Sequence, residues 1–419
     1  MTMVPSSSGI GAPGTAPAPA SLARSPLASA PAAAATSIVF SRGSTLATMR
    51  DASATFTAGQ QQQIQLQTNA FLESLVLDFA LTATNTAAAA VAFAADAPFN
   101  AIASIKLDDP AGQSIITPIT GYQLMLLNKY LPDTDCAFDP KLDPNYSAPS
   151  GTGASGSISF RLVLPVEIRR RDALGALNNS AANQRYLLTV QAIGSFSTTG
   201  QTSLYTTAPG VPGTSLTLQV WQQYWTSPPA TITTAQGSAQ VSTTPSGLGT
   251  VGFVRFESHN EMSGGGSPQI QLNNVGDYIE QLIFVLRNNA SPAVRDQSDW
   301  PPEFDWWIND FQVHSLGVNV WQRAMARFYR YTGAGASAAS TTASVPDTAG
   351  GLDVGVYCLG PWMNGIFDKN ENFAPPNQYL ATDATTKLQI RGSTWGATAG
   401  KLEVISRMVK PLSGATLYA

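Results

Sequence analysis

The chain carries the same β-rich pattern twice, and this repeat limits the possible fold more than any other feature. An extended apolar stretch, strands and a short amphipathic helix follow one another in residues 64–130 and again in residues 270–331. Matching pieces are offset by roughly 190 to 205 positions, which is too long for a solenoid repeat or a propeller blade. Two whole domains of like fold are the simplest explanation.

Both copies are predicted to consist mainly of β-strands. Apolar side chains recur at every second position, as at Leu75, Leu77, Phe79 and Leu81, which is typical of half-buried antiparallel strands. Turn-rich connections between many strands favour an all-β fold of sandwiches or jelly rolls. The remaining strands are expected at 158–166, 187–194 and 216–225 in the first copy and at 352–360, 387–395 and 401–409 in the second.

Two short helices are predicted at equivalent places in the copies. Apolar side chains at helical spacing form one stripe in each. These are Tyr122, Met125 and Leu126 in the first copy and Trp321, Ala324, Met325 and Phe328 in the second. We expect both stripes to pack on the flank of a barrel and not to form a cofactor site.

Changes in composition along the chain predict the boundaries of an arm, two domains, a linker and a tail. The start is a Pro/Ala/Ser/Gly tract with too little large apolar surface to offset the entropy of ordering, so an extended N-terminal arm is predicted. The predicted divisions are an arm over 1–58, a first domain over 59–228, a linker over 229–248, a second domain over 249–412 and a C-terminal tail over 413–419.

Arg24, Arg42 and Arg50 are the only charged side chains in the first fifty residues. One hypothesis is a solubilising disordered tail. The other is an arm that faces an anionic surface, either lipid headgroups or packaged nucleic acid. Each basic residue near a membrane contributes about 1 kcal/mol, so a single arm would bind weakly and a lattice of many copies would add avidity.

Charge is scarce in this chain. Charged residues make up 12% of it, about half of the usual share of roughly 25%, which suggests that much of the surface faces other protein or is a Ser/Thr-rich solvated β surface. The net charge of -4 provides no electrostatic footprint for nucleic acid, so sequence-specific nucleic-acid binding is not expected. No apolar run reaches the length of about eighteen residues that a membrane span needs, and no signal-peptide pattern opens the chain. We therefore expect a soluble protein.

The sequence contains few of the residues and motifs that are typical of enzymes. Cys136 and Cys358 are the only cysteines and fall in different copies, which predicts free buried thiols and no disulfide framework or zinc site. His259 and His314 are the only histidines, and neither belongs to a metal or nucleophile motif. We predict no enzyme activity, no cofactor and no metal.

The segment DWPPEFDWW, residues 299–307, is the best candidate for a ligand site. Its three carboxylates alternate with Trp300, Trp306 and Trp307, which could stack on a sugar. Alternatively the tryptophans fill the core or a subunit interface. The alternative functions are therefore a phage spike or a carbohydrate-binding tandem β-sandwich protein. A glycoside hydrolase would need a facing carboxylate pair that spacing does not reveal.

The order of elements resembles the double jelly-roll major capsid proteins of tailless icosahedral double-stranded DNA viruses, in particular those of tectivirus-like bacteriophages. In each copy a strand leads into a short helix that begins at a glycine, GYQLMLLNKY at Gly121 and GVNVWQRAM at Gly317. The stretches FNAIASIKLDDPAGQSIITPITGYQLMLLN and YLATDATTKLQIRG, the latter followed by KLEVISRMVKPL, are similar to the strand patterns of that family. The resemblance covers residues 60–412.

The resemblance implies two tandem jelly-roll β-barrels, each with a short flanking α-helix, and no catalytic residue. It also implies a homotrimer, whose six jelly rolls form a pseudo-hexagonal capsomer that tiles an icosahedral shell around an internal membrane and a dsDNA genome. Neighbouring capsomers, penton and minor capsid proteins and internal membrane lipid would be its partners. It would reside in the virion, after assembly in the host cytoplasm. The arm has no evident amphipathic helix, so clamping a neighbouring capsomer is an alternative to contact with lipid.

Overall fold

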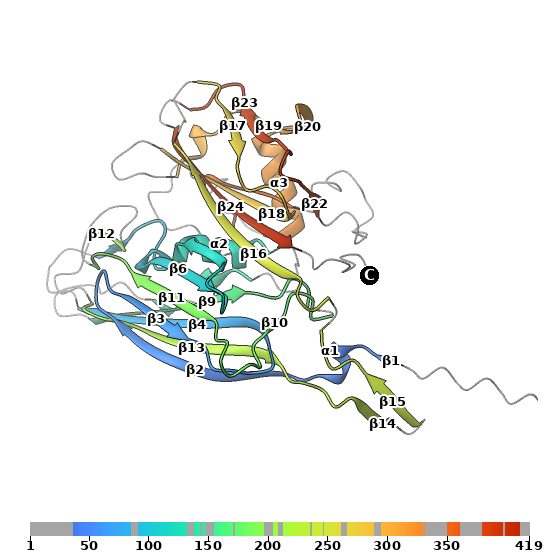
Figure 1. Cartoon of the computed structure of the whole chain (residues 1–419). Coiled ribbons are helices and arrows are strands. Elements are labelled where there is room, and N and C mark those ends of the chain that lie inside the picture. Colours follow the sequence, from blue (N-terminus) through green and yellow to red (C-terminus); the bar gives the residue numbers. More distant parts are fainter. Residues whose placement is uncertain are drawn as a thin grey trace, which may run out of the picture.

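Two β-barrels lie one above the other in the computed structural model, and a small sheet projects from the base of the lower one (Figure 1). The structure describes residues 37–84, 91–131, 138–142, 145–146, 155–170, 172–196, 204–207, 213–234, 237–245, 247–260, 266–288, 295–329, 331, 350–360, 379–396 and 399–410. Arg24 of the predicted arm and Cys136, one of the two cysteines, lie outside the described residues.

The first barrel consists of eight strands in two sheets. One sheet has the order β2-β13-β4-β9, and the other has the order β3-β11-β6-β7. The first sheet comprises β2 (Leu46–Phe56), β13 (Leu216–Trp225), β4 (Phe71–Thr84) and β9 (Ser155–Pro165), extended by β8 (Asn145–Tyr146) and β10 (Leu177–Asn178). The second comprises β3 (Gln61–Gln65), β11 (Leu187–Ala192), β6 (Ile102–Asp108) and β7 (Ser114–Ile119). A separate pair is formed by β5 (Ala92–Phe93) and β12 (Tyr205–Thr207).

The second barrel repeats this connectivity strand for strand. Its first sheet has the order β16-β24-β18-β21 and comprises β16 (Val251–His259), β24 (Ala399–Lys410), β18 (Tyr278–Asn288) and β21 (Val356–Leu359), with β22 (Leu380–Ala381) on β18. Its other sheet has the order β17-β23-β19-β20 and comprises β17 (Gln269–Leu272), β23 (Leu388–Gly392), β19 (Glu303–Ile308) and β20 (Phe311–Gly317). In both barrels the strands, counted along the chain, pair as 1-8-3-6 and 2-7-4-5, which is jelly-roll topology.

Alternating side chains build each barrel around an apolar interior. On β4, Leu75, Leu77, Phe79 and Leu81 are buried, while Asp78 between them lies on the outer face. A strand places successive side chains on opposite faces, so this alternation determines which face points inward. One continuous hydrophobic cluster extends through both barrels.

Helix α2 (Gly121–Lys129) follows β7, and α3 (Val318–Tyr329) follows β20. Both helices were predicted from their apolar stripes, and Tyr122, Met125, Trp321 and Met325 are indeed buried. A side chain at Gly121 would place its Cβ 2.2 Å from the main-chain oxygen of Phe99, so the close approach of the helix requires glycine at this position. The short 3-10 helices are η1 (Phe99–Ala101), η2 (Pro140–Leu142) and η3 (Gln297–Asp299).

The region predicted as an arm over 1–58 contains a strand of the first barrel. The eleven residues of β2 pair with β13, because the hydrogen bonds of this edge outweigh the low hydrophobicity that suggested a tail. Before β2 lie β1 (Ser37–Ile38) and α1 (Phe40–Gly43). The predicted linker, 229–248, forms a hairpin of β14 (Thr231–Thr234) and β15 (Gly237–Val241), and β1 joins its edge. The other predicted boundaries stay predictions.

Candidate assembly interface

The two barrels are joined by a continuous sheet. Strand β7 of the first barrel pairs in parallel with β16 of the second, with Ile116 opposite Val254. The hydroxyl of Thr117 accepts a hydrogen bond from the amide of Phe256 at 3.1 Å, and the guanidinium of Arg255 donates to the main-chain oxygen of Ser114 at 2.7 Å. This pairing merges one sheet of each barrel into a single structure.

Helix α2 fills the space between the barrels. The side-chain amide of Gln123 donates to the carboxylate of Glu403 on β24 at 3.3 Å. At the other end, the main-chain oxygen of Tyr130 accepts hydrogen bonds from Gln281 on β18 and from the hydroxyl of Tyr329, the latter at 3.0 Å. The helix is therefore enclosed by its own barrel on one side and by the outer face of sheet β16-β24-β18-β21 on the other.

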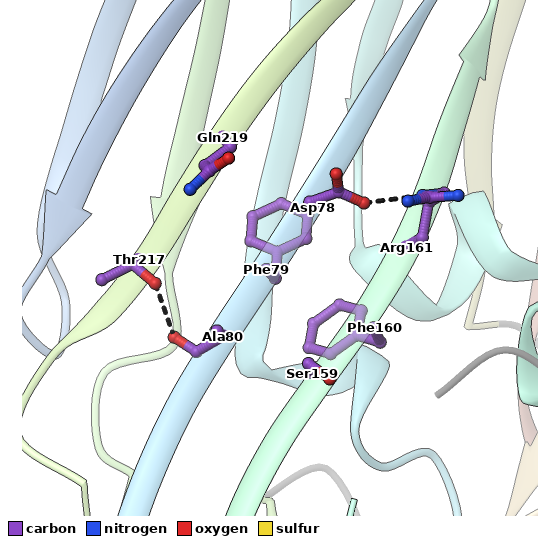
Figure 2. A pocket seen from close by; sticks show the side chains of 8 residues that line it. All are labelled: Asp78, Phe79, Ala80, Ser159, Phe160, Arg161, Thr217 and Gln219. Atoms are coloured by element: carbon purple, nitrogen blue, oxygen red, sulfur yellow. Dashed lines mark hydrogen bonds and ion pairs between the residues drawn. The ribbon is translucent and has the colours of Figure 1, made fainter. Parts of the chain in front are cut away.

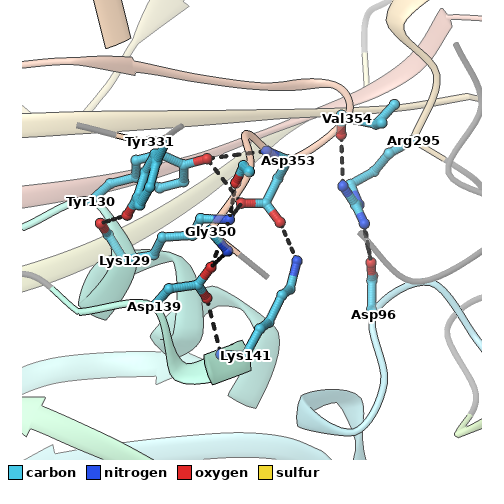
Figure 3. Close-up of polar contacts among 11 residues, drawn as sticks. Asp96, Lys129, Tyr130, Asp139, Lys141, Arg295, Tyr331, Gly350, Asp353 and Val354 are labelled. Carbon is cyan, nitrogen blue, oxygen red and sulfur yellow. Dashed lines mark hydrogen bonds and ion pairs between the residues drawn. The ribbon is translucent and has the colours of Figure 1, made fainter. Parts of the chain in front are cut away.

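A cluster of buried charges lies at the end of α2 (Figure 3). The fully buried ammonium of Lys129 lies 2.8 Å from Oδ2 of Asp353 and 3.4 Å from Oδ2 of Asp139. Asp353, which comes from the second barrel, also pairs with Lys141 and accepts a hydrogen bond from the hydroxyl of Tyr130 at 2.9 Å. Two cations and two carboxylates balance one another, which offsets part of the cost of burying charge.

A second charged cluster connects Asp96 of the first barrel with the second barrel. Asp96 lies 2.9 Å from Arg287 on β18 and 2.9 Å from Arg295, both measured from carboxylate oxygen to guanidinium nitrogen, and the contact with Arg295 is visible in Figure 3. Arg287 also pairs with Glu403 at 3.3 Å. Burial by itself would raise the pKa of Asp96, but the charges of the two arginines outweigh it and hold that pKa below its usual value.

A third polar contact is formed by Glu167, just after β9. Arg407 on β24 donates to the main-chain oxygen of Glu167 at 2.9 Å and pairs through Nε with Glu280 at 2.7 Å. The indole of Trp225 donates to the Glu167 carboxyl at 3.3 Å. Burial, and then the nearby Glu73, raise the pKa of Glu167 to about 9, so its carboxyl is neutral at physiological pH.

The tryptophans of the DWPPEFDWW segment do not form a surface cluster. Trp300 and Trp306 are 4% and 2% exposed and belong to the core of the second barrel, where Trp300 packs against Tyr357 and Trp395. Trp307, at the next position of β19, points to the opposite face and stacks under the guanidinium of Arg391 at 3.9 Å. The three rings therefore do not line one sugar-binding face.

The arginines of the predicted arm lie in two different elements. Arg42 is in α1 and Arg50 is in the middle of β2, and both are exposed. Arg24 lies outside the described residues. Their suggested contact with lipid or with the inner face of a shell stays a prediction.

The described residues offer little for catalysis or metal binding. His259 is buried with Nε2 3.5 Å from Glu257, and His314 lies on β20. No group of three or more His, Cys, Asp or Glu side chains in the described ranges is arranged to hold a metal ion. In the same ranges no helix is long and apolar enough to span a bilayer.

The charged residues between the barrels were not predicted from the sequence. A signal was present, because Lys129 ends the apolar run LMLLNK and Arg287 ends the apolar run LIFVLR. Charged residues are seldom fully buried unless they are paired, so charge at the end of an apolar stretch points to a buried partner. The partners are distant in sequence, and nothing in the local pattern names them.

The chain has the fold of known viral capsid proteins. The STIV MCP structure, from Sulfolobus Turreted Icosahedral Virus, matches with a TM-score of 0.59 and 12% identity, over 87% of this chain and 96% of that chain. The PBCV-1 virus capsid matches with a TM-score of 0.54 and 10% identity, over 87% of this chain and 93% of that chain. The Faustovirus major capsid protein matches with a TM-score of 0.51 and 8% identity, over 88% of this chain and 90% of that chain. No family model and no curated protein sequence matches. The predicted double jelly-roll fold is confirmed.

Proposed function

We propose that this protein is a viral major capsid protein that builds a shell and catalyses no reaction. The observation that carries the proposal is the joint between the barrels, in which β7 pairs with β16 and α2 is enclosed. Two jelly rolls held in one fixed orientation are a suitable building block for a lattice. The likeness of the fold to capsid proteins supports the same conclusion.

The proposed assembly is a homotrimer that forms a pseudo-hexagonal capsomer. Three chains with two like barrels each provide six similar blocks, so a trimer can occupy positions of sixfold-like packing. Such capsomers would tile an icosahedral shell around an internal membrane and a dsDNA genome, in a virion of tectivirus-like type. Their further partners would be neighbouring capsomers and the penton and minor capsid proteins.

Native mass and electron microscopy test this proposal. We expect purified protein to behave as a compact trimer by light scattering coupled to size exclusion, and to give pseudo-hexagonal particles in negative stain. A chain that stays monomeric at micromolar concentration would overturn the trimeric capsomer.

Glycan binding is the alternative outcome. With Trp300 and Trp306 buried, a sugar bound by the segment 299–307 would have to stack on Trp307, whose ring already packs against the guanidinium of Arg391. A glycan array probed with the wild type and with Trp307→Ala tests it. Binding that is lost in the variant, from a protein that forms no lattice, would replace the capsid proposal.

The N-terminal arm is proposed to act on the inner side of the shell, through a neighbouring capsomer or through lipid. Deleting residues 1–36 leaves β1 and its pairing with β15 intact. We expect the shortened protein to form trimers with unchanged thermal stability but to assemble shells or bind anionic vesicles poorly. Normal particles from the shortened protein would show that the arm is only a tail.

A further inference from the structure

The ammonium of Lys129 is fully enclosed at the end of α2. Its side chain is 0% exposed, and so is that of Asp353, whose Oδ2 lies 2.8 Å from the ammonium nitrogen. The rings of Tyr130 and Tyr331 lie beside the same ammonium, with their centroids at 5.6 Å and 5.1 Å. An amino group and a carboxyl group are therefore held in contact and shut off from bulk water.

This enclosure distinguishes the pair at the end of α2 from ion pairs at the surface. Arg161 and Asp78 lie 2.7 Å apart in a hollow on the outer side of the first barrel, where they are 51% and 32% exposed (Figure 2). Lys106 and Asp108 lie 2.8 Å apart and are 33% and 10% exposed. Water that reaches such pairs keeps both groups charged and screens them from one another.

A second carboxylate, that of Asp139, is fixed beside the same ammonium. Its Oδ2 lies 3.4 Å from Nζ of Lys129, and its side chain is 1% exposed. The main-chain amides of Lys141 and Gly350 donate to it at 2.9 Å and 2.7 Å, so the backbone sets its orientation. Asp139 is therefore placed where it can exchange a proton with the nitrogen of Lys129.

The two oxygens of the Asp353 carboxyl group have different partners (Figure 3). Oδ2 faces Lys129 and accepts a hydrogen bond from the hydroxyl of Tyr130 at 2.9 Å. Oδ1 pairs with the ammonium of Lys141. A cation at Oδ1 stabilises negative charge that develops on this oxygen, so the carbon between the two oxygens is activated toward a nucleophile.

Burial favours the uncharged form of a lysine and aspartate pair. Transfer of the ammonium proton to the carboxylate replaces two buried charges by an amine and a carboxylic acid, and a buried site penalises charges more than neutral polar groups. The neutral amine is a nucleophile, and the carboxylic acid is its electrophile. Because the two groups are already in contact, much of the entropic part of the barrier is removed.

We propose that Lys129 and Asp353 condense to an intramolecular isopeptide bond, which joins the end of α2 covalently to the second barrel. The proton of the Lys129 ammonium passes to Oδ2 of Asp353, and the free amine then attacks Cγ of Asp353. The C–N bond forms while the electron pair of the carbonyl moves to Oδ1, opposite Lys141. Asp139 takes a proton from the nitrogen and gives it to the Oδ2 hydroxyl, which leaves as water when the carbonyl re-forms.

The reaction is balanced within the cluster. One ammonium and one carboxylate become one amide and one water, no co-reactant is consumed, and Asp139 ends in the form in which it began. Lys141 and Asp139 remain as one cation and one anion, so the site stays neutral overall. Exclusion of water from the site protects the amide from hydrolysis.

The bond closes a loop of the chain that runs from α2 through much of both barrels. Such a cross-link restricts the unfolded chain in the way that a disulfide does. It also fixes the second barrel relative to α2 by a covalent bond in addition to the pairing of β7 with β16. The inference goes beyond the proposed function and does not depend on it.

The intact mass of the denatured, full-length wild type tests the inference. We expect a mass that is lower than the one calculated from the sequence by the mass of one water molecule. Trypsin should not cleave after Lys129, because its amine is acylated, so peptide 107–141 should be recovered joined to peptide 331–369. Fragmentation of this branched product should place the branch at Lys129 and Asp353.

Three variants define the roles of the residues. Lys129→Arg keeps a cation at this position but cannot act as the nucleophile, so it should show its full calculated mass and no branched peptide. Asp139→Asn should accumulate the unlinked chain, because an amide does not relay the proton. As the matched control, Lys106→Arg changes a lysine at the same 2.8 Å from a carboxylate in an exposed pair, and should keep both the mass deficit and the branch.

The wild-type measurement decides by itself, whether or not each variant folds. A full calculated mass, with a linear peptide that ends at Lys129, would overturn the inference and leave Lys129 and Asp353 as an ion pair. A loss of water without a branch, which indicates a cyclised aspartate, or a branch at Lys141 would overturn it as well. The capsid proposal stands in each of these cases, since native mass and particle shape decide it separately.

Discussion

Helices α2 and α3 begin at the same point of the two jelly rolls, yet they have opposite surroundings. All nine residues of α2 are buried, whereas α3 buries Trp321, Met325 and Tyr329 and exposes much of its other side. The sequences reflect this difference, since LMLL in α2 is apolar all round and α3 has a single apolar stripe. A helix that is apolar on every side needs protein on every side, and for α2 the second barrel provides it.

The pKa values of three buried carboxyls at the joint differ according to their partners. Asp96 and Glu403 contact arginine, so their pKa values are lowered in spite of burial. Burial, and then the nearby Glu73, raise the pKa of Glu167, whose carboxyl accepts hydrogen bonds, within the described ranges, only from the indole of Trp225. Asp96 and Glu403 therefore keep their charge, whereas the Glu167 carboxyl, which pairs with no cation among the described residues, gives it up.

The largest effect is expected from Lys129→Met. It would leave the carboxylates of Asp139 and Asp353 buried with one cation fewer, and should cost about 3 to 5 kcal/mol of unfolding free energy. Chemical unfolding at fixed protein concentration measures the loss. In the control, Lys387→Met removes an exposed pair with Asp310 and should cost less than about 1 kcal/mol. Equal losses would mean that the joint contributes no more than a surface contact.

A second effect, which depends on pH, is expected from Glu167→Gln. Because the folded pKa of about 9 lies above the unfolded value, the stability contributed by this group is complete at acid pH and is lost as pH rises toward 9. The loss for one such group is at most about 1.4 kcal/mol per pH unit.

Unfolding free energies measured between about pH 5 and pH 9 should fall less steeply in the Glu167→Gln variant than in the wild type. Asp310→Asn, at an exposed carboxyl, should keep the slope of the wild type. If the slope of Glu167→Gln equals that of the wild type, the carboxyl of Glu167 is ionised in the folded wild-type protein.

The smallest effect is expected at the start of α2. The hydroxyl of Thr120 accepts from the amide of Gln123 at 3.1 Å, and the side chain of Gln123 accepts from the amide of Thr120 at 2.9 Å. Thr120→Ala removes half of this capping box and should cost about 1 kcal/mol. Thermal melts should place Thr120→Ser between the wild type and the alanine variant. Identical melting of all three would mean that packing between the barrels, and not the cap, holds the helix.

Much of the fold could be predicted from the sequence because its main signals are local. The alternation at Leu75, Leu77 and Phe79 indicated a strand, and the stripes at Met125 and Trp321 indicated helices. The tryptophans of residues 299–307 could not be assigned in this way. An alternating strand shows that its two faces differ, but not which face is covered, so Trp306 and Trp307 could not be divided between core and surface from the sequence.

The sequence by itself determined that there are two β-rich units, where many of their strands and the two helices α2 and α3 lie, and that the second repeats the first. Periodicity and turn chemistry are properties of neighbouring residues and can be read from the chain. Only the tertiary structure decided that Leu46–Phe56 is a barrel strand, that β7 pairs with β16, and that Lys129 meets Asp353. These depend on contacts between residues up to a few hundred positions apart, where the hydrogen-bonding and charge balance of buried groups selects the partner.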